Sequence, residues 1–212
     1  MEYFNQNKLI KNIDNIYNWS LKAGILLIVA AIPLSFVLPV SVSFENSWLE
    51  NLQVVALIAG CIFNAKLIRQ SSDRQLADFH IWNTVMTAFM AFREVGWGRV
   101  LYPYTFNDKG PVFVGMKDFA WKTEAQTLIV LFIAFLIVFG LMRFPWKKIL
   151  RCRPPFLIIL LMLICVVFSK GGDHGFILGR LQGQIVEEFG ELAFYTMIPA
   201  LCIHYRRELS KK

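Results

Sequence analysis

Charged residues are scarce in this chain. Only 17% of its 212 residues are Asp, Glu, Lys or Arg, while 56% are hydrophobic. About a quarter of the residues in a soluble domain are charged, so this chain has too few charged residues to cover the surface of a water-soluble globule. The composition therefore argues against an ordinary soluble protein and favours a membrane protein.

Cysteine, histidine and catalytic motifs are also sparse. The four cysteines are Cys61, Cys152, Cys165 and Cys202. They form no C-x-x-C pair, which argues against a zinc ribbon or a disulfide framework and indicates small core residues. The chain has no P-loop, G-x-G-x-x-G, H-E-x-x-H or G-x-S-x-G motif. Since no such motif indicates a reaction, a function has to be inferred from the placement of polar residues.

Long apolar runs are what the sequence has in abundance. About 20 apolar residues in a helix cross a hydrocarbon core of about 30 Å. Six runs approach this length: 23–43, 48–68, 80–101, 125–143, 155–170 and 184–203. Their solid apolar character favours helices over the alternation of a strand barrel. We predict an all-α, polytopic transmembrane bundle of about six helices, built as a single domain over residues 1–212, in which the first run is a retained helix and not a signal peptide.

The segment before the first run is amphipathic. Residues 5–22 place Leu9, Ile13 and Tyr17 at near-helical spacing among polar side chains. This pattern predicts a short interfacial helix on the cytoplasmic leaflet, with a partner-binding helix as the alternative. Pro33 and Pro39 predict a kink or an early end of the first membrane helix.

The distribution of charge predicts the topology. Of the 22 Lys and Arg residues, 15 fall in the terminal segments and in the two loops that alternation places on the same face. The positive-inside rule then puts both termini in the cytoplasm. We interpret this basic charge as a contact for anionic lipid headgroups, not for nucleic acid. The aromatic loop 102–124 is predicted on the outer face, as a lid or a binding element.

Ionisable residues inside membrane helices are costly and usually functional. Four clusters lie near the predicted outer face: Glu50, Asn51 and Gln53; Arg93, Glu94 and Trp97; Lys170, Asp173 and His174; Gln184, Glu187 and Glu191. The last three form one stripe on the final helix, and Glu188 falls off that stripe. Beside them Gly171, Gly175, Gly179 and Gly183 recur every four residues. This repeat fits a close-packing ridge or a flexible re-entrant segment.

Carboxylates with one imidazole suit general acid–base catalysis or the binding of a divalent metal ion, which is the one cofactor we consider. The candidate catalytic residues are Glu94, His174 and Glu191, with Glu50 and Gln53 in support. The candidate metal ligands are Asp173, His174, Glu187 and Glu191. The candidate substrate-binding residues are Arg93, Trp97, Arg99, Lys170 and Arg180, because guanidinium and ammonium groups bind phosphate or carboxylate. His80 and His204 are predicted at the cytoplasmic ends, too far away for a three-histidine zinc site.

One short motif resembles a known pattern. The stretch REVGWGR over residues 93–99, preceded on the second helix by ENLQ at residues 50–53, is similar to an E-x-x-W-G-x-R motif of uncharacterised bacterial multi-pass membrane proteins. Arg99 directly follows Gly98, one residue short of that motif. The resemblance implies a bacterial inner-membrane protein and no particular activity.

These features favour a membrane-embedded enzyme that hydrolyses or transfers a group on a lipid or lipid-linked substrate from the outer leaflet. A proton- or cation-coupled transporter is the first alternative, although its polar groups would be concentrated on one side. The second alternative is a non-catalytic subunit of a membrane complex, in which Arg93 and Glu94 only form a structural ion pair. The sequence does not indicate which proteins would be its partners.

Overall fold

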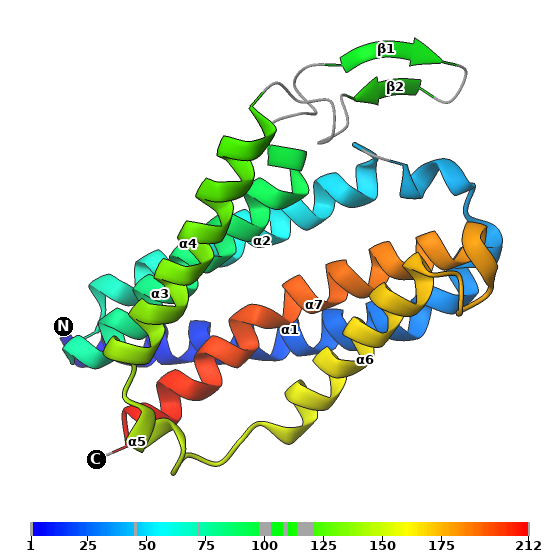
Figure 1. The fold of residues 1–212 in the computed structure, drawn as a ribbon. Helices are drawn as coiled ribbons and strands as arrows, with labels where there is room; N and C mark the ends of the chain where they lie inside the picture. The colour runs from blue at the N-terminus through cyan, green and yellow to red at the C-terminus, as the bar shows by residue number, and fades with distance from the viewer. Residues whose placement is uncertain are drawn as a thin grey trace.

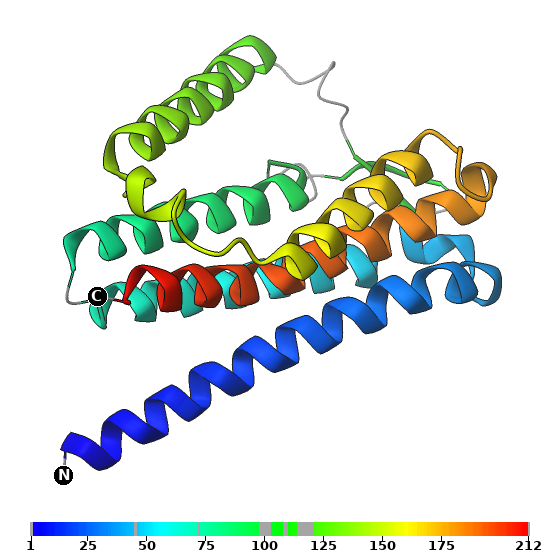
Figure 2. The same ribbon diagram turned by 90° about the horizontal axis from the view of Figure 1, so that it is seen from below.

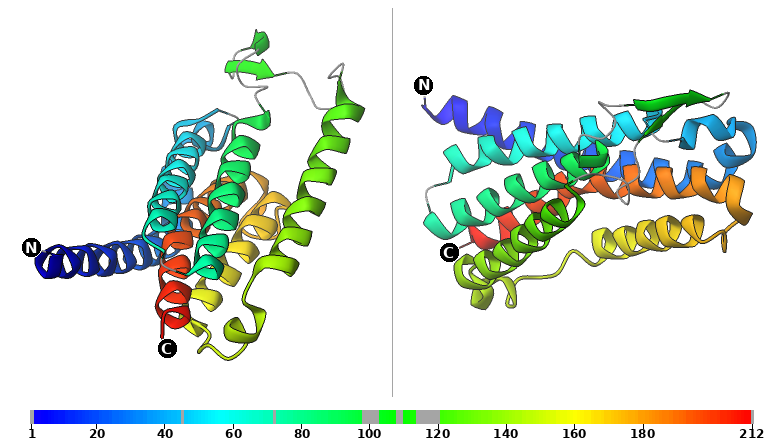
Figure 3. Two further views of the ribbon diagram at one scale, coloured as in Figure 1. Left: turned by 90° about the vertical axis from the view of Figure 1, so that its left-hand side faces the viewer. Right: turned by 45° about the horizontal axis from the view of Figure 1, so that its top comes forward.

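The structure is a computed structural model that describes residues 2–44, 46–71, 73–97, 103–107, 110–113 and 121–211. Six long helices dominate it: α1 (Glu2–Val37), α2 (Trp48–Arg69), α3 (Arg74–Glu94), α4 (Lys122–Arg143), α6 (Phe156–Asp173) and α7 (Gly179–Leu209). They alternate in direction, so both termini lie at the same end of the bundle (Figure 1; Figure 3, right). We call this the terminal end. The opposite end, where α3 finishes and α7 starts, is the hairpin end.

Shorter elements connect the long helices. A 3-10 helix, η1 (Val40–Ser43), follows α1, and α5 (Trp146–Ile149) follows α4. An antiparallel hairpin of β1 (Pro103–Asn107) and β2 (Gly110–Phe113) lies between α3 and α4 at the hairpin end (Figure 1). Within the predicted loop 102–124, the described residues thus form this hairpin and, from Lys122, the first turn of α4.

Four helices are long and apolar enough to cross a membrane: Asn12–Val37, Val40–Arg69, Lys122–Arg143 and Phe156–Asp173. Large apolar side chains stay exposed along them, including Leu26, Leu131 and Leu160. Exposed apolar surface on this scale suits a lipid environment. The four helices therefore indicate a membrane protein.

The other two predicted spans, in α3 and α7, form long helices that are less apolar. α7 packs against α1, α6 and α2, and it lies between α1 on one side and α3 and α4 on the other (Figure 2). Many of its residues are buried, from Gly183 to Leu209. Because its neighbours cover it, α7 can carry polar residues that a lipid-facing helix could not.

The N-terminal segment differs from the prediction. α1 is one continuous helix from Glu2 to Val37, without the break that separated an interfacial helix over 5–22 from a span over 23–43. The helix ends six residues before the predicted residue 43, since Pro39 disfavours a helical conformation in the residue before it and caps η1 instead. The early end predicted from the prolines is confirmed, whereas an interfacial placement of residues 5–22 stays a prediction.

α3 is shifted toward the N-terminus relative to the predicted run 80–101. It begins at Arg74, where Asp73 caps it by accepting a hydrogen bond from the Gln75 backbone N–H at 3.0 Å. It ends at Glu94, because Gly96 and Trp97 adopt left-handed conformations with φ of 54° and 58°. Arg93 and Glu94 therefore occupy the last turn of the helix, about 30 Å from its start.

α6 and α7 cross at very short range through glycines. A Cβ added to Gly172 would lie 2.2 Å from the carbonyl oxygen of Gly183, and one on Gly190 would lie 2.9 Å from Cβ of Phe168. Of the four glycines of the predicted repeat, Gly183 packs in this way, whereas Gly175 and Gly179 form the turn between the helices with φ of 70° and 74°. The repeat therefore contains two kinds of glycine: Gly183 allows close packing of the two helices, and Gly175 and Gly179 allow the chain to turn.

The cysteines are as predicted. All four are free, with Cys165 and Cys202 buried and Cys61 and Cys152 partly buried. They act as small core residues, and Cys165 belongs to a cluster with Ala193 and Met197 between α6 and α7.

The predicted orientation can be tested by cysteine labelling. In a cysteine-free background, Asn107→Cys in β1 should react with a membrane-impermeant maleimide in intact bacterial cells. Ser71→Cys, in the α2–α3 connection at the opposite end, should react only after permeabilisation, because the positive-inside rule places it in the cytoplasm. The reverse labelling pattern would overturn the orientation.

Candidate functional site

The last turn of α3 carries an ion pair between neighbouring residues. Nε of Arg93 lies 3.0 Å from Oε1 of Glu94. The two side chains differ in exposure: Glu94 is 6% exposed and Arg93 is 51% exposed. A buried carboxylate requires partners, and Arg93 supplies one while it also reaches the surface. The C-terminal end of a helix also favours a cation such as Arg93.

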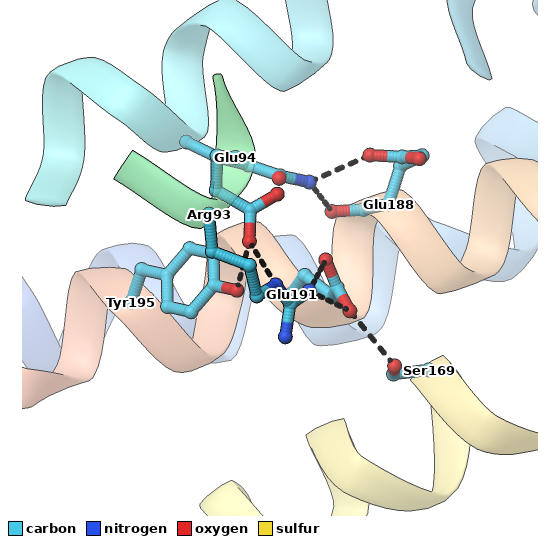
Figure 4. Close-up of polar contacts among 7 residues, drawn as sticks. Arg93, Glu94, Ser169, Glu188, Glu191 and Tyr195 are labelled. Atoms are coloured by element: carbon cyan, nitrogen blue, oxygen red, sulfur yellow. Dashed lines mark hydrogen bonds and ion pairs between the residues drawn. The ribbon is translucent and has the colours of Figure 1, made fainter. Parts of the chain in front are cut away.

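Two residues of α7 complete the coordination of this pair. The Tyr195 hydroxyl donates to Oε1 of Glu94 at 2.7 Å, and Nη2 of Arg93 donates to both oxygens of Glu191 at 3.2 and 3.3 Å. Glu191 and Tyr195 are four residues apart, so they lie on one face of α7. Figure 4 shows Arg93 between the two carboxylates. The end of α3 is therefore tied to the middle of α7.

Two further contacts extend the network to α6 and α2. The Ser169 hydroxyl donates to Oε1 of Glu191 at 3.1 Å (Figure 4). Nε2 of Gln53 donates to Oε2 of Glu188 at 2.7 Å and to the Glu188 backbone carbonyl at 3.0 Å. We call the whole set the carboxylate network: Gln53, Arg93, Glu94, Ser169, Glu188, Glu191 and Tyr195.

A pocket of about 240 Å³ lies beside this network, between α3, α6 and α7. We call it the α3–α6–α7 pocket; it is lined by Met90, Arg93, Cys165, Val166, Ser169, Lys170, Gly190, Glu191, Phe194 and Tyr195. Two cations, one carboxylate and two hydroxyls thus face the same space as several apolar side chains. A space with this lining fits an amphiphile whose charged group sits near Arg93 and Lys170.

The structure brings together several of the residues predicted from the sequence. Arg93, Lys170 and Glu191 line the pocket, and Glu94 lies behind Arg93 and Tyr195. These residues come from three helices, α3, α6 and α7, which meet at the pocket.

His174 is placed differently from the predicted acid–base pair with Glu94. It follows the last residue of α6, its side chain is exposed, and its ring lies 5.9 Å from that of Phe176. Among the described residues, the side-chain partners of Glu94 are Arg93 and Tyr195, and the lining of the pocket does not include His174. The reason is that α6 ends before His174, which leaves the imidazole on the turn outside the helix contacts.

The predicted metal ligands do not form one site. Within the part of the chain that the structure describes, no three His, Cys, Asp or Glu side chains group closely enough to hold a metal ion. Asp173 and His174 are exposed at the C-terminal end of α6, while Glu191 directs its oxygens toward Arg93 and Ser169. The guanidinium of Arg93 thus neutralises Glu191, a carboxylate that the prediction had assigned to a metal.

The remaining predicted residues lie around the network. Trp97 packs its ring against Phe89 and Phe92, at centroid distances of 5.2 and 5.5 Å, instead of following Glu94 on a helical face. Arg180 is exposed in the first turn of α7, and Arg99 lies outside the described residues. Glu50 accepts a hydrogen bond from the Asn46 backbone N–H at the start of α2.

Sequence reasoning did not identify Ser169, Glu188 or Tyr195. Glu188 was set aside because it falls off the stripe of Glu187 and Glu191, yet it pairs with Gln53. A stripe argument assumes one buried face, whereas α7 is covered on several sides. The spacing of four between Glu191 and Tyr195 was visible in the sequence and is the one signal that pointed to Tyr195.

This arrangement offers two chemical capacities. Arg93 and Lys170 can bind an anionic group that enters the pocket, with charge-assisted hydrogen bonds. Glu191 accepts a hydrogen bond from the Ser169 hydroxyl. It is therefore positioned as a general base for that hydroxyl or for a water beside it.

No known protein family, curated protein or solved structure matches this chain.

Proposed function

We propose that this protein is a membrane-embedded enzyme that hydrolyses or transfers a group on a lipid or lipid-linked substrate with an anionic headgroup. The observation that carries the proposal is the α3–α6–α7 pocket, where cationic, nucleophilic and apolar side chains face one space. An acyl chain is compatible with Met90, Val166 and Phe194, and an anionic headgroup with Arg93 and Lys170. With the orientation predicted from the positive-inside rule, the substrate comes from the outer leaflet.

The residues of the pocket have distinct roles in this proposal. Arg93 and Lys170 hold the headgroup and neutralise negative charge that develops at the reacting centre. Glu191 takes the proton from the attacking Ser169 hydroxyl or from a bound water, and that proton then passes to the leaving group. Glu94 and Tyr195 act through Arg93, which they hold in position.

Three variants separate binding from turnover. Lys170→Gln should weaken retention of an anionic lipid by about tenfold, the loss expected for one charge-assisted hydrogen bond. Glu191→Gln should retain the lipid and lower turnover by about 10²–10⁴-fold, because the amide cannot accept the proton. Arg180→Gln removes an exposed cation that is not part of the pocket lining, and it should behave as the unchanged protein.

Native mass spectrometry of the detergent-purified protein would measure lipid retention. Turnover would be followed by lipid profiling of bacterial membranes that contain each variant. Equal lipid retention in Lys170→Gln and Arg180→Gln would show that the pocket is not the headgroup site. If the lipid profile is the same with the unchanged protein and with Glu191→Gln, the catalytic role is wrong.

A further inference from the structure

A row of buried polar residues runs along the interior of the bundle, from the carboxylate network toward the terminal end. On α3, His80, Thr87 and Glu94 are spaced by seven residues and are 0%, 2% and 6% exposed. Seven residues are about two helical turns, so the three side chains lie on one face. That face is covered, although each side chain is polar.

α2 and α7 supply polar partners along the same face. Nδ1 of His80 lies 3.1 Å from Oδ1 of Asn64 on α2. The Thr87 hydroxyl donates to the Asn83 and Thr84 backbone carbonyls of α3 at 2.8 and 3.1 Å, and its oxygen can also accept a hydrogen bond from water. Glu94 accepts the hydrogen bond of Tyr195 from α7. We call this group the polar seam: Gln53, Asn64, His80, Thr87, Glu94, Glu188 and Tyr195.

Two atoms of the polar seam are buried without a hydrogen-bond partner among the described residues. They are Oε1 of Gln53 and Nε2 of His80, on side chains that are fully buried. Buried polar atoms in proteins are nearly always satisfied, and internal water satisfies those that no protein group reaches. The two atoms lie toward opposite ends of the seam, so internal water at both ends would satisfy them.

The hydrogen bonds around His80 fix the role of its second nitrogen. Nδ2 of Asn64 donates to the Gly60 carbonyl at 3.0 Å, so Oδ1 of Asn64 is the acceptor that faces His80. Nδ1 of a neutral His80 is therefore the donor, and Nε2 carries the lone pair. The unpartnered nitrogen can accept a proton or a hydrogen bond from water.

The seam spans a large part of the bundle. Glu94 and His80 are 14 residues apart on α3, which corresponds to about 21 Å. Beyond His80, Arg206 of α7 donates to the Leu67 and Gln70 carbonyls at the terminal end. The charged or titratable groups around the seam are Arg93 and Glu94 on α3, Glu50 on α2 and Glu188, Glu191, Tyr195, Cys202 and Arg206 on α7.

We propose that the polar seam holds internal water and conducts protons between Glu94 and His80. Carboxylate, hydroxyl and imidazole groups each accept a proton on one side and release one on the other, which is what a relay requires. Metal cations fit this path poorly, because the half near His80 offers an imidazole and an amide but no carboxylate of the seam. This activity shares Glu94 and Tyr195 with the proposed enzyme site, but it does not depend on the lipid chemistry.

The test is proton flux into liposomes. The purified protein is reconstituted with the pH-sensitive dye pyranine inside, and valinomycin with a potassium gradient drives proton entry. We expect a rate several-fold above that of protein-free liposomes. Glu94→Gln and His80→Gln should each return the rate to the protein-free level, while Lys148→Gln, at the exposed terminal end, should leave it unchanged.

A third variant keeps the test decisive if a buried substitution impairs folding. Thr87→Val preserves the shape of the side chain and removes only the hydroxyl, so it should lower the flux at least threefold in a well-folded protein. A flux equal to that of protein-free liposomes overturns the proposal. So does a flux that Glu94→Gln, His80→Gln and Thr87→Val all leave unchanged. Lipid retention in the α3–α6–α7 pocket, measured on the same preparations, reports separately on the proposed enzyme.

Discussion

Replacing Arg93 by glutamine is expected to lower the free energy of unfolding by about 3 kcal/mol. Arg93 contacts both Glu94 and Glu191, which are 6% and 16% exposed. Its removal leaves two adjacent carboxylates in the bundle interior without their shared cation. Breaking one side of a buried ion pair costs about 3–5 kcal/mol, and the lower value applies because Arg93 itself is half-exposed.

Glu94→Gln is expected to be much milder. The amide oxygen of glutamine can still accept hydrogen bonds from Tyr195 and Arg93, and Arg93 keeps its contact with Glu191. The cation that remains is half-exposed and therefore hydrated. The two variants differ because both carboxylates share Arg93. Replacing Arg93 leaves both without this cation, whereas replacing Glu94 leaves Arg93 paired with Glu191.

Urea or thermal unfolding of the purified variants in detergent would measure the difference. Lys148→Gln is the matched control, since Lys148 pairs with Asp73 at 3.4 Å and both side chains are about half exposed, a setting in which a salt bridge contributes about 0–1 kcal/mol. Equal destabilisation by Arg93→Gln and Glu94→Gln would show that Arg93 does not bridge the two carboxylates.

Gly172→Ala is expected to destabilise the protein by about 3 kcal/mol or more, at the upper end of overpacking effects. The added methyl group would lie 2.2 Å from the Gly183 carbonyl oxygen and 3.0 Å from the Glu187 backbone nitrogen. Both contacts are with backbone, which cannot rotate away as a side chain can. α6 and α7 would have to separate, and this movement would also widen the pocket that Ser169 and Glu191 line.

Gly60→Ala provides the control for this prediction. The nearest neighbour of its added methyl group is the Thr87 methyl at 3.9 Å, an ordinary contact, and alanine favours a helix over glycine by about 0.5–1 kcal/mol. Unfolding in detergent should therefore show Gly60→Ala at or above the stability of the unchanged protein. If the two alanine variants unfold alike, the crossing of α6 and α7 is wider than described.

The sequence predicted the membrane character and most of the helices. The apolar runs 48–68 and 125–143 correspond closely to α2 and α4, because lipid-facing helices must be apolar along their whole length. The same rule fails for α3 and α7, whose ends were misplaced by five to seven residues. Their limits depend on the Asp73 cap, on left-handed Gly96 and on the glycine turn before α7, which hydropathy does not record.

The candidate site was predicted only in part. Arg93, Glu94 and Glu191 stood out because charge inside an apolar segment is costly wherever it occurs. Their pairing was not visible, and His174, at a similar predicted depth, was grouped with them. Depth along a helix follows from residue number, but the direction of a side chain around the helix depends on which neighbours surround it.

The sequence by itself determined that this chain is largely helical, that it suits a membrane, and that its carboxylates gather toward one end. Those properties follow from local composition and from the period of the helix. Only the tertiary structure decided that Arg93 joins Glu94 to Glu191, that Glu188 meets Gln53, and that His80 faces Asn64. Each of these pairs joins helices distant in sequence, and their alignment depends on close backbone contacts such as that of Gly172 with Gly183.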